Sequence, residues 1–120
     1  MAGGGNAILT KSKAFAVRIV RLYQHLADKK KEFVISRQLL RSGTSIGANV
    51  REAVQAQSHR DFAAKMGIAL KEASESEYWL ELLAETDYLT EKEYASMAKS
   101  CGELNKLLTA IVKTAKGKGR

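Results

Sequence analysis

The stretch Gln38–Ala53, QLLRSGTSIGANVREA, decides the fold of this chain. Residues 43–47 within it, GTSIG, match the G-x-S-x-G pattern of a hydrolase nucleophile elbow, in which a strand enters the serine and a helix leaves it. Apolar residues nevertheless recur at helical spacing on both sides of the serine, at Leu39, Ile46, Val50 and Val54. A serine inside a continuous helix does not lie on a strained turn. The stretch therefore predicts a helix, and Ser45 is not expected to be catalytic.

Two glycines interrupt this predicted helix on its apolar side. Gly43 and Gly47 lie four residues apart, which places them on one face. Each costs a helix about 1 kcal/mol relative to alanine. The pair makes sense where a neighbouring helix approaches closely, because glycine has no Cβ to keep two backbones apart. We therefore expect a tight helix–helix contact at these two positions.

Capping residues mark where the predicted helices begin. Ser36 is the expected N-cap of the helix discussed above. Ser58 and Asp61 form a capping-box-like pair that opens the next helix, and Thr90 and Glu93 do the same for the last one. The predicted helices run from Thr10 or Ser12 to about Lys30, from Ser36 to about Gln57, from Ser58 to about Glu85, and from Thr90 to about Ala115.

Each of the four segments has the apolar stripe of an amphipathic helix. The last is the most regular, with an a/d seam at Tyr94, Met97, Cys101, Leu104, Leu108, Ile111 and Ala115. Four such helices joined by short connections predict an all-α, antiparallel, up-down-up-down four-helix bundle. We expect residues 10–115 to form the bundle, residues 1–9 to be a disordered N-terminus and residues 116–120 to be a disordered basic tail.

The composition limits the classes of function. The 120 residues contain no proline and allow one domain. No apolar run approaches the roughly 20 residues that span a membrane, and the first residues lack the pattern of a signal peptide. A single cysteine, Cys101, cannot form an internal disulfide, which fits a reducing cytoplasm. The acidic residues lack the Glu-x-x-His pairs of metal-binding bundles, so neither a metal nor another cofactor is expected.

The net charge of +7 is unevenly distributed. Residues 11–32 hold seven basic and two acidic residues, a net charge of +5, whereas residues 58–87 hold three basic and seven acidic ones, a net charge of −4. Residues 90–120 return to +4, with seven basic and three acidic residues. Such polarity either steers a polyanion to one surface or pairs complementary surfaces of neighbouring subunits.

Basic faces of the first and last helices are the candidate nucleic-acid contacts. Cations at helical spacing suit phosphate groups, which supply most sequence-independent affinity. No aromatic residue interleaves them, so base stacking is not indicated. An ordinary solvated face explains the same pattern equally well. The candidates are Lys11, Arg18, Arg21, Lys99, Lys106 and Lys113.

Two strips on the central helices are the candidate oligomer interface. The second helix has a polar edge in which asparagine and serine, poor choices for a solvated helix, stand at Ser45 and Asn49. Arg41 and Glu52 on the same edge are expected to pair across an interface, although a solvated face is the alternative. The third helix has a second apolar strip that a four-helix bundle leaves without a partner, at Ile68, Trp79 and Leu82.

Several segments of the chain resemble a known family. The family is the four-helix bundle family that includes proteins encoded in intervening sequences of bacterial 23S ribosomal RNA. It is also similar to the accessory variability protein of diversity-generating retroelements, a basic pentameric barrel that binds the reverse transcriptase and nucleic acid. The resemblance covers roughly residues 10 to 115 and is carried by residues 41–53, 58–62, 68–72, 78–80 and 88–89.

This resemblance implies a homopentamer of four-helix bundles without catalytic activity and with a connection to RNA or a ribonucleoprotein. Family members usually carry an acidic or neutral residue where this chain has Arg51, so a polar contact of the family at this position does not transfer. The expected function is a cytoplasmic, non-enzymatic homo-oligomer that binds nucleic acid. The alternative is a scaffold for a protein client, without intrinsic affinity for nucleic acid.

Overall fold

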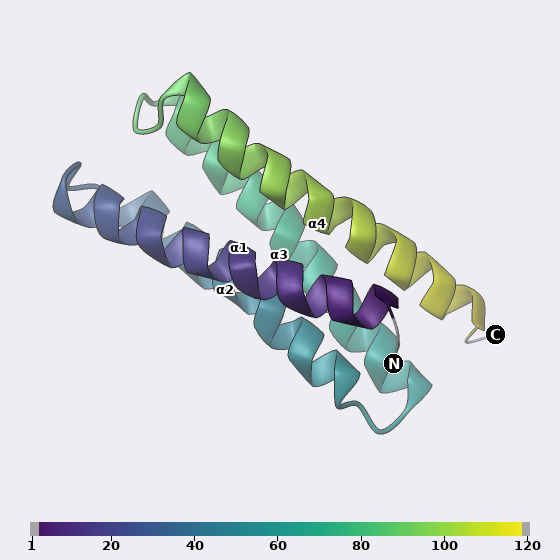
Figure 1. Ribbon diagram of the computed structural model, residues 1–120. Helices are drawn as coiled ribbons and strands as arrows, with labels where there is room; N and C mark the ends of the chain where they lie inside the picture. Colours follow the sequence, from purple (N-terminus) through teal and green to yellow (C-terminus); the bar gives the residue numbers. More distant parts are fainter. Residues whose placement is uncertain (1–2, 119–120) are drawn as a thin grey trace.

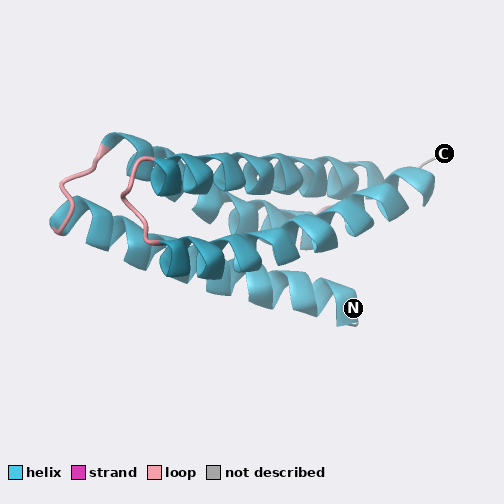
Figure 2. Ribbon diagram, turned by 90° about the horizontal axis from the view of Figure 1, so that it is seen from above, coloured by secondary structure: helices cyan, strands magenta, loops and turns pink. Residues whose placement is uncertain are grey.

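The computed structural model describes residues 3–118, and these residues form four α-helices joined by short loops. The helices are α1 (Gly3–Asp28), α2 (Val34–Val54), α3 (His59–Glu85) and α4 (Glu91–Lys118). Successive helices run in opposite directions, so that the α1–α2 and α3–α4 loops lie at one end of an elongated bundle measuring 47 × 21 × 20 Å (Figures 1 and 2). The predicted all-α antiparallel four-helix bundle is confirmed.

The helices are arranged in a ring in which sequence neighbours pack side by side. α2 packs on α1 and on α3, and α3 packs on α4. α1 and α4 also touch, but this contact is the least extensive of the four, and within residues 3–118 the backbones of α1 and α3 do not come close to each other. The edge between α1 and α4 is thus the most open side of the bundle (Figure 1).

Apolar side chains of all four helices fill the interior. The largest fully buried side chain is that of Phe15, and α4 contributes Leu104 and Leu108. The seam of α4 differs from the prediction at its end, because Val112 is buried while Ile111 is only half-buried. A straight helix has 3.6 residues per turn, so a strict heptad seam drifts by about 20° per repeat and a neighbouring position takes over.

The two glycines of α2 lie against α1, as predicted. A Cβ added at Gly43 would lie 2.7 Å from Cγ1 of Ile19, and one added at Gly47 would lie 3.4 Å from the carbonyl oxygen of Ser12. Gly43 therefore makes room for a buried side chain, and Gly47 for the backbone of α1. The two glycines of the G-x-S-x-G pattern therefore allow α2 to pack closely against α1.

The ends of the outer helices extend beyond the predicted bundle. α1 begins at Gly3, so a disordered segment over residues 3–9 is wrong, as is a helix start at Thr10 or Ser12. The reason is Ile8, which is fully buried and continues the apolar stripe one turn before Ser12. α4 likewise continues to Lys118, which makes residues 116–118 helical. Residues 1, 2, 119 and 120, also predicted to be disordered, lie outside the described residues.

The start of α2 has a different cap from the predicted one. Ser36 is a buried residue within the first turn, and its hydroxyl donates to the carbonyl oxygen of Glu32 at 2.8 Å. The cap is the carboxylate of Glu32, which accepts hydrogen bonds from the backbone N–H groups of Val34, Ile35 and Ser36. The other two caps are confirmed, with Ser58 accepting from the N–H of Asp61 and Thr90 exchanging hydrogen bonds with Glu93.

None of the helices in residues 3–118 is long and apolar enough to cross a membrane.

Candidate functional site

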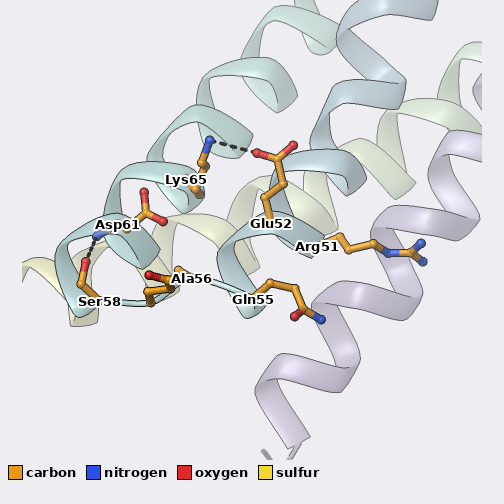
Figure 3. Close-up of a pocket in the computed structure, with 8 residues that line it drawn as sticks. Arg51, Glu52, Gln55, Ala56, Ser58, Asp61 and Lys65 are labelled. Carbon is orange, nitrogen blue, oxygen red and sulfur yellow. Dashed lines mark hydrogen bonds and ion pairs between the residues drawn. The ribbon is translucent and has the colours of Figure 1, made fainter.

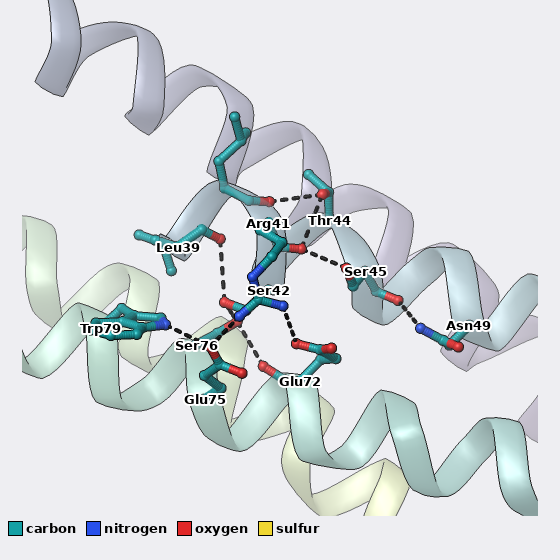
Figure 4. Close-up of polar contacts among 11 residues, drawn as sticks. Leu39, Arg41, Ser42, Thr44, Ser45, Asn49, Glu72, Glu75, Ser76 and Trp79 are labelled. Atoms are coloured by element: carbon teal, nitrogen blue, oxygen red, sulfur yellow. Dashed lines mark hydrogen bonds and ion pairs between the residues drawn. The ribbon is translucent and has the colours of Figure 1, made fainter. Parts of the chain in front are cut away.

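The structure brings the predicted interface residues onto one side of the α2–α3 pair, which we call the α2–α3 face. Arg41, Ser45 and Asn49 follow one another along α2, opposite the acidic side chains of α3 (Figure 4). The helical spacing of α3 places Ile68, Trp79 and Leu82 on the same side, because each lies four or seven residues from Glu72 or Glu75. The face consists of Arg41, Ser45, Asn49, Glu52, Ile68, Trp79 and Leu82.

A charged network joins the two helices at the centre of this face. Arg41 Nη1 lies 3.2 Å from Glu72 Oε1, and Arg41 Nη2 contacts Glu75 Oε2. The same Glu75 oxygen accepts a hydrogen bond from Trp79 Nε1 at 3.1 Å (Figure 4). The guanidinium and the indole are thus held by one carboxylate, which fixes both side chains at the surface.

Within one chain, Arg41 and Glu52 each pair with α3, and their predicted pairing across an interface between subunits stays a prediction. Arg41 is paired with α3, and Glu52 Oε1 lies 2.9 Å from Lys65 Nζ. Arg41 and Glu52 are eleven positions apart on α2, about 16 Å at 1.5 Å per residue, so each takes the opposite charge that α3 presents beside it. This Glu52 contact raises the pKa of Lys65.

Ser45 and Asn49 are bound to the backbone of their own helix. Ser45 Oγ donates to the carbonyl oxygen of Arg41 at 2.6 Å, and Asn49 Nδ2 donates to that of Ser45 at 2.9 Å (Figure 4). Ser45 lies in the middle of an unbroken helix, without the strand-to-helix turn of an elbow. Nothing in this geometry activates its hydroxyl as a nucleophile.

A buried pair of serines lies beneath the charged network, and sequence reasoning did not identify it. The hydroxyl oxygens of Ser42 and Ser76 are 2.8 Å apart, and both residues are fully buried. Ser76 also donates to the carbonyl oxygen of Glu72 at 2.9 Å. The available signal was the position of Ser42, four residues before Ile46 on the apolar stripe of α2. The pair satisfies its own polar atoms and brings α2 and α3 close together.

The predicted basic residues of α1 have different surroundings from one another. Arg18 is tied to α4, because its guanidinium donates to Ser96 Oγ and to Ser100 Oγ, both at 2.7 Å. Lys11 Nζ lies 4.0 Å from a carboxylate oxygen of Glu103. Arg21 is exposed and donates only weakly, to Gln24 at 3.4 Å. Arg18 is therefore a structural link between α1 and α4, and its role as a phosphate contact stays a prediction.

The three predicted lysines of α4 form an exposed row. Lys99, Lys106 and Lys113 repeat every seven residues, so they stand about 10 Å apart along one side of the helix. All three are exposed, and no ion pair within the described part of the chain involves them. We call this set the α4 lysine row. Its charges are available to an external anion.

The turn between α2 and α3 holds an open polar hollow of about 740 Å³ (Figure 3). Charged side chains of both signs line it, including Arg51, Asp61 and the Glu52–Lys65 pair. Because these opposite charges neutralise one another, the hollow has no marked preference for an anion or a cation. We assign no ligand to it.

The side chains that could bind a metal, and the single thiol, lie apart from one another in residues 3–118. No cluster of three or more His, Cys, Asp or Glu side chains there is placed to hold a metal ion. Cys101 is fully buried, and burial, with a smaller effect of Glu77, raises the pKa of its thiol to about 12. The thiolate that would act as a nucleophile is thus strongly disfavoured.

These features define a class: an all-α protein built as a four-helix bundle. The chain belongs to the 23S rRNA-intervening sequence protein family, whose model matches residues 5–110. It is also similar to a solved structure, a protein of unknown function from the S23 ribosomal protein family of Bacteroides thetaiotaomicron VPI-5482. The two share 58% sequence identity with a TM-score of 0.91 over 92% of this chain and 99% of the other. No curated protein matches the sequence.

Proposed function

We propose that this protein is a non-enzymatic, cytoplasmic, homo-oligomeric module that binds nucleic acid, as structured RNA or within a ribonucleoprotein. The observation that carries the proposal is the α4 lysine row, three exposed cations in register without ion-pair partners in the described chain. Lys11 and Arg21 add exposed cations on α1, the helix next to α4. Membership in a family named for 23S rRNA intervening sequences supports an RNA ligand.

The chemistry of the row points to phosphate contacts and not to base reading. Lysine ammonium groups neutralise phosphates, and the released counterions make the affinity fall as salt is added. The side chains exposed beside the row, Thr109 and Ala110, offer no aromatic ring for stacking. Recognition by this surface therefore depends on the shape and charge density of the RNA.

A binding titration against a structured RNA over a salt series tests this proposal. The triple variant Lys99→Gln, Lys106→Gln and Lys113→Gln should reduce the slope of log K against log salt by about 2 to 3, because each lost phosphate contact removes roughly 0.7 to 0.9. The matched control removes three charges elsewhere, by replacing Lys29, Lys30 and Lys31 of the α1–α2 loop with glutamine. Absence of binding at low salt, or an affinity that does not fall with salt, would refute the proposal.

The non-enzymatic part of the proposal rests on the environment of the reactive side chains. Ser45 is bonded to its own helix, and Cys101 is buried with a raised pKa. We expect neither residue of the folded protein to react with a serine-hydrolase probe or a thiol reagent. Labelling of Ser45 by such a probe would contradict this part.

The homo-oligomeric part of the proposal rests on the α2–α3 face and on the family resemblance. Ile68 is 41% exposed and Tyr78, beside Trp79, is 56% exposed, which is unusual for large apolar side chains of a bundle. The resemblance supplies five as the expected number of subunits. Light scattering at micromolar concentration measures the mass directly, and a stable monomer would rule out this part.

A protein scaffold is the second candidate function. It is favoured by Val34, which is 76% exposed at the start of α2 and would suit an apolar contact with a client. A client captured by the full-length protein after nuclease treatment, together with no intrinsic RNA affinity, would favour the scaffold over the RNA-binding module.

A further inference from the structure

The outer side of α1 carries an apolar patch that the interior of the bundle does not use. Val17 is 52% exposed and Val20 is 38% exposed, although their neighbours Phe15 and Ile19 are buried. Together with Ala16, Lys13 and Arg21 they line a shallow depression of about 380 Å³. We call this set the α1 patch. Its centre is aliphatic and the charges at its rim are both positive.

The end of the α2–α3 face around Leu82 has the opposite electrostatic character, because Glu72 and Glu75 at its centre are paired with Arg41 whereas Glu81 and Glu85 are not in any ion pair of the described residues. Residues 72–87 contain six acidic and no basic residues, and Glu81 and Glu85 are exposed within one turn of Leu82. By contrast, residues 3–27 contain four basic and no acidic residues. The two apolar surfaces of this chain therefore differ in the sign of the charge that surrounds them.

We propose that the α1 patch of one copy docks on the next copy at the Leu82 end of the α2–α3 face, beside the exposed side chain of Tyr78. This inference rests on the proposed homo-oligomer and adds which two surfaces meet. An apolar centre with a charged rim on each side is the usual anatomy of a protein interface, and opposite charges at the two rims are attractive.

The charges also exclude the symmetrical alternatives. Two α1 patches facing each other would bring the positive charges of Lys13 and Arg21 together. Two copies of the surface around Leu82 would likewise bring carboxylates together and repel. A self-complementary dimer through either surface is therefore disfavoured. Contact between unlike surfaces is heterologous, and it builds a closed ring when the rotation between neighbours closes.

The position of the two surfaces lets one copy use both at once. The α1 patch lies on α1. The Leu82 end of the α2–α3 face lies on α3, whose backbone does not come close to that of α1 in the described residues. A neighbour on one surface thus leaves the other surface free. Each subunit then has two neighbours, as every member of a ring must.

Site-directed crosslinking tests the pairing. Val17→Cys and Tyr78→Cys each place one exposed thiol on one of the two surfaces, and the native Cys101 is fully buried. The two single variants, carrying different tags, are co-expressed and treated with a short bifunctional thiol reagent. We expect a mixed-tag dimer at least tenfold more abundant than any dimer formed by either variant alone, and no product from the wild-type protein.

A charge exchange provides a second, independent measurement. The pair Lys13→Glu with Arg21→Glu should shift the light-scattering mass toward the monomer, as should the pair Glu81→Lys with Glu85→Lys. Combining all four changes in one chain should restore the wild-type mass, because every interface then has opposite charges again. Lys92→Glu with Lys116→Glu, two exposed residues of α4 outside the α4 lysine row, is the matched control and should leave the mass unchanged.

The outcomes separate this inference from the proposed function. An oligomer that forms normally but gives no mixed-tag dimer overturns the pairing and leaves the homo-oligomer intact. Efficient crosslinking of either single variant with itself also overturns it, in favour of a symmetrical contact. A wild-type protein that is monomeric by light scattering overturns the homo-oligomer and the pairing together.

Discussion

Single residues of this protein decide how closely its helices approach and how they begin. Gly43 leaves space for Ile19 of α1, a β-branched and fully buried side chain that cannot move aside easily. Glu32 supplies with one carboxylate the acceptors that the first three N–H groups of α2 would otherwise lack. Both residues act through the backbone of α2, the helix that also holds the α2–α3 face together.

Gly43→Ala should destabilise the fold although alanine is the better helix former. Overpacking against Ile19 costs about 1 to 3 kcal/mol, which exceeds the gain of about 1 kcal/mol in helix propensity. Gly102→Ala is the matched control, because a Cβ at Gly102 meets nothing within 4 Å and only the gain remains. Chemical denaturation should therefore move the two variants in opposite directions. Equal stabilisation of both variants would show that Ile19 of α1 can shift to make room for the added methyl group.

The cap at Glu32 predicts a loss of stability in acid. Burial raises the pKa of Glu32, but the N–H groups of Ile35, Ser36 and Val34, with the Ser36 hydroxyl, outweigh it, so the pKa lies below its ordinary value of 4.5. A carboxyl group with a lowered pKa stabilises the fold above that ordinary value, and the contribution is lost as the pH falls through the folded-state pKa. Glu32→Gln should lower the free energy of unfolding at pH 7 by about 1 kcal/mol, as loss of a cap does.

A pH series of denaturant melts measures this effect. The difference between the wild-type protein and Glu32→Gln should shrink as the pH falls below 4.5. Glu91→Gln, an exposed residue in the first turn of α4, is the control for general charge effects. A difference that is the same at every pH would mean that the charge of Glu32 does not hold the cap.

Residues whose role follows from periodicity were predictable, and residues whose role follows from a partner were not. The glycine pair and the caps at Ser58 and Thr90 depend on positions a few residues apart, which a sequence displays directly. The role of Glu32 depends on a loop in which Lys31 adopts a positive φ of 57°, and this turns the chain so that the carboxylate reaches α2. No spacing pattern encodes that turn.

At the scale of elements, the contact between α1 and α4 is the weakest side of the bundle. Arg18 spans it with hydrogen bonds to Ser96 and Ser100, and the long Lys11–Glu103 pair is exposed. Exposed ion pairs contribute little, typically below about 1 kcal/mol, so the Arg18 contacts are the more important of the two. Arg18, which the sequence predicts to be a phosphate contact, therefore also holds α1 against α4.

Arg18→Ala should lower the free energy of unfolding by about 1 to 2 kcal/mol, because it removes hydrogen bonds that are only partly screened by water. Arg21→Ala, on the same helix but without a comparable partner, should change it by less than about 0.5 kcal/mol. Amide hydrogen exchange should also show faster opening of α1 in the Arg18 variant. If the two variants are equally stable, Arg18 does not hold α1 against α4.

The same pair of variants distinguishes structure from RNA contact. In the proposed function, Lys106→Ala should weaken RNA binding more than Arg18→Ala does, although only Arg18→Ala reduces stability. A larger loss of RNA affinity in Arg18→Ala, measured where both proteins are fully folded, would show that Arg18 itself contacts phosphate.

Helix existence was predictable from the sequence, whereas helix ends were less so. The three glycines near the N-terminus are poor helix formers, whereas the burial of Ile8 favours a helix there. Propensity is worth about 1 kcal/mol for each glycine, and full burial of an isoleucine is worth about 1.5 to 3 kcal/mol. The burial of Ile8 is thus comparable to the combined cost of the glycines, and a single helix considered alone does not contain this tertiary contribution.

At the scale of the whole molecule, charge and exposed apolar surface are arranged along the ring of helices. α1 and its surroundings are basic, the second half of α3 is acidic, and α4 is basic again. The prediction of a four-helix bundle made α2 and α3 neighbours, but it placed Arg41 and Trp79 on two separate strips. It could not supply the acidic link between them, because Glu75 is one of several carboxylates on α3 and only the packed structure selects it.

The salt dependence of assembly should separate the electrostatic attraction that brings subunits together from the apolar packing that holds them. The complementary rims are exposed, and at about 1 M salt the Debye length falls to about 3 Å, so their attraction is largely screened. We expect the association rate to fall at least severalfold between low and high salt while the dissociation rate changes little, since the apolar centre is insensitive to screening. Stopped-flow mixing of dissociated subunits measures both, and a dissociation rate that carries the whole salt effect would contradict this view.

Trp79 gives the unmodified protein an optical reporter of its own surface. It is the single tryptophan of the chain, half-buried on the α2–α3 face with its indole N–H bonded to Glu75 and its ring edge-on to Tyr78. Indole emission shifts with the polarity around the ring, and excitation at a wavelength that tyrosine does not absorb makes the emission report on this one face. Dilution of the oligomer or binding of a partner can therefore be followed by the emission maximum of Trp79, without a label and without altering the sequence.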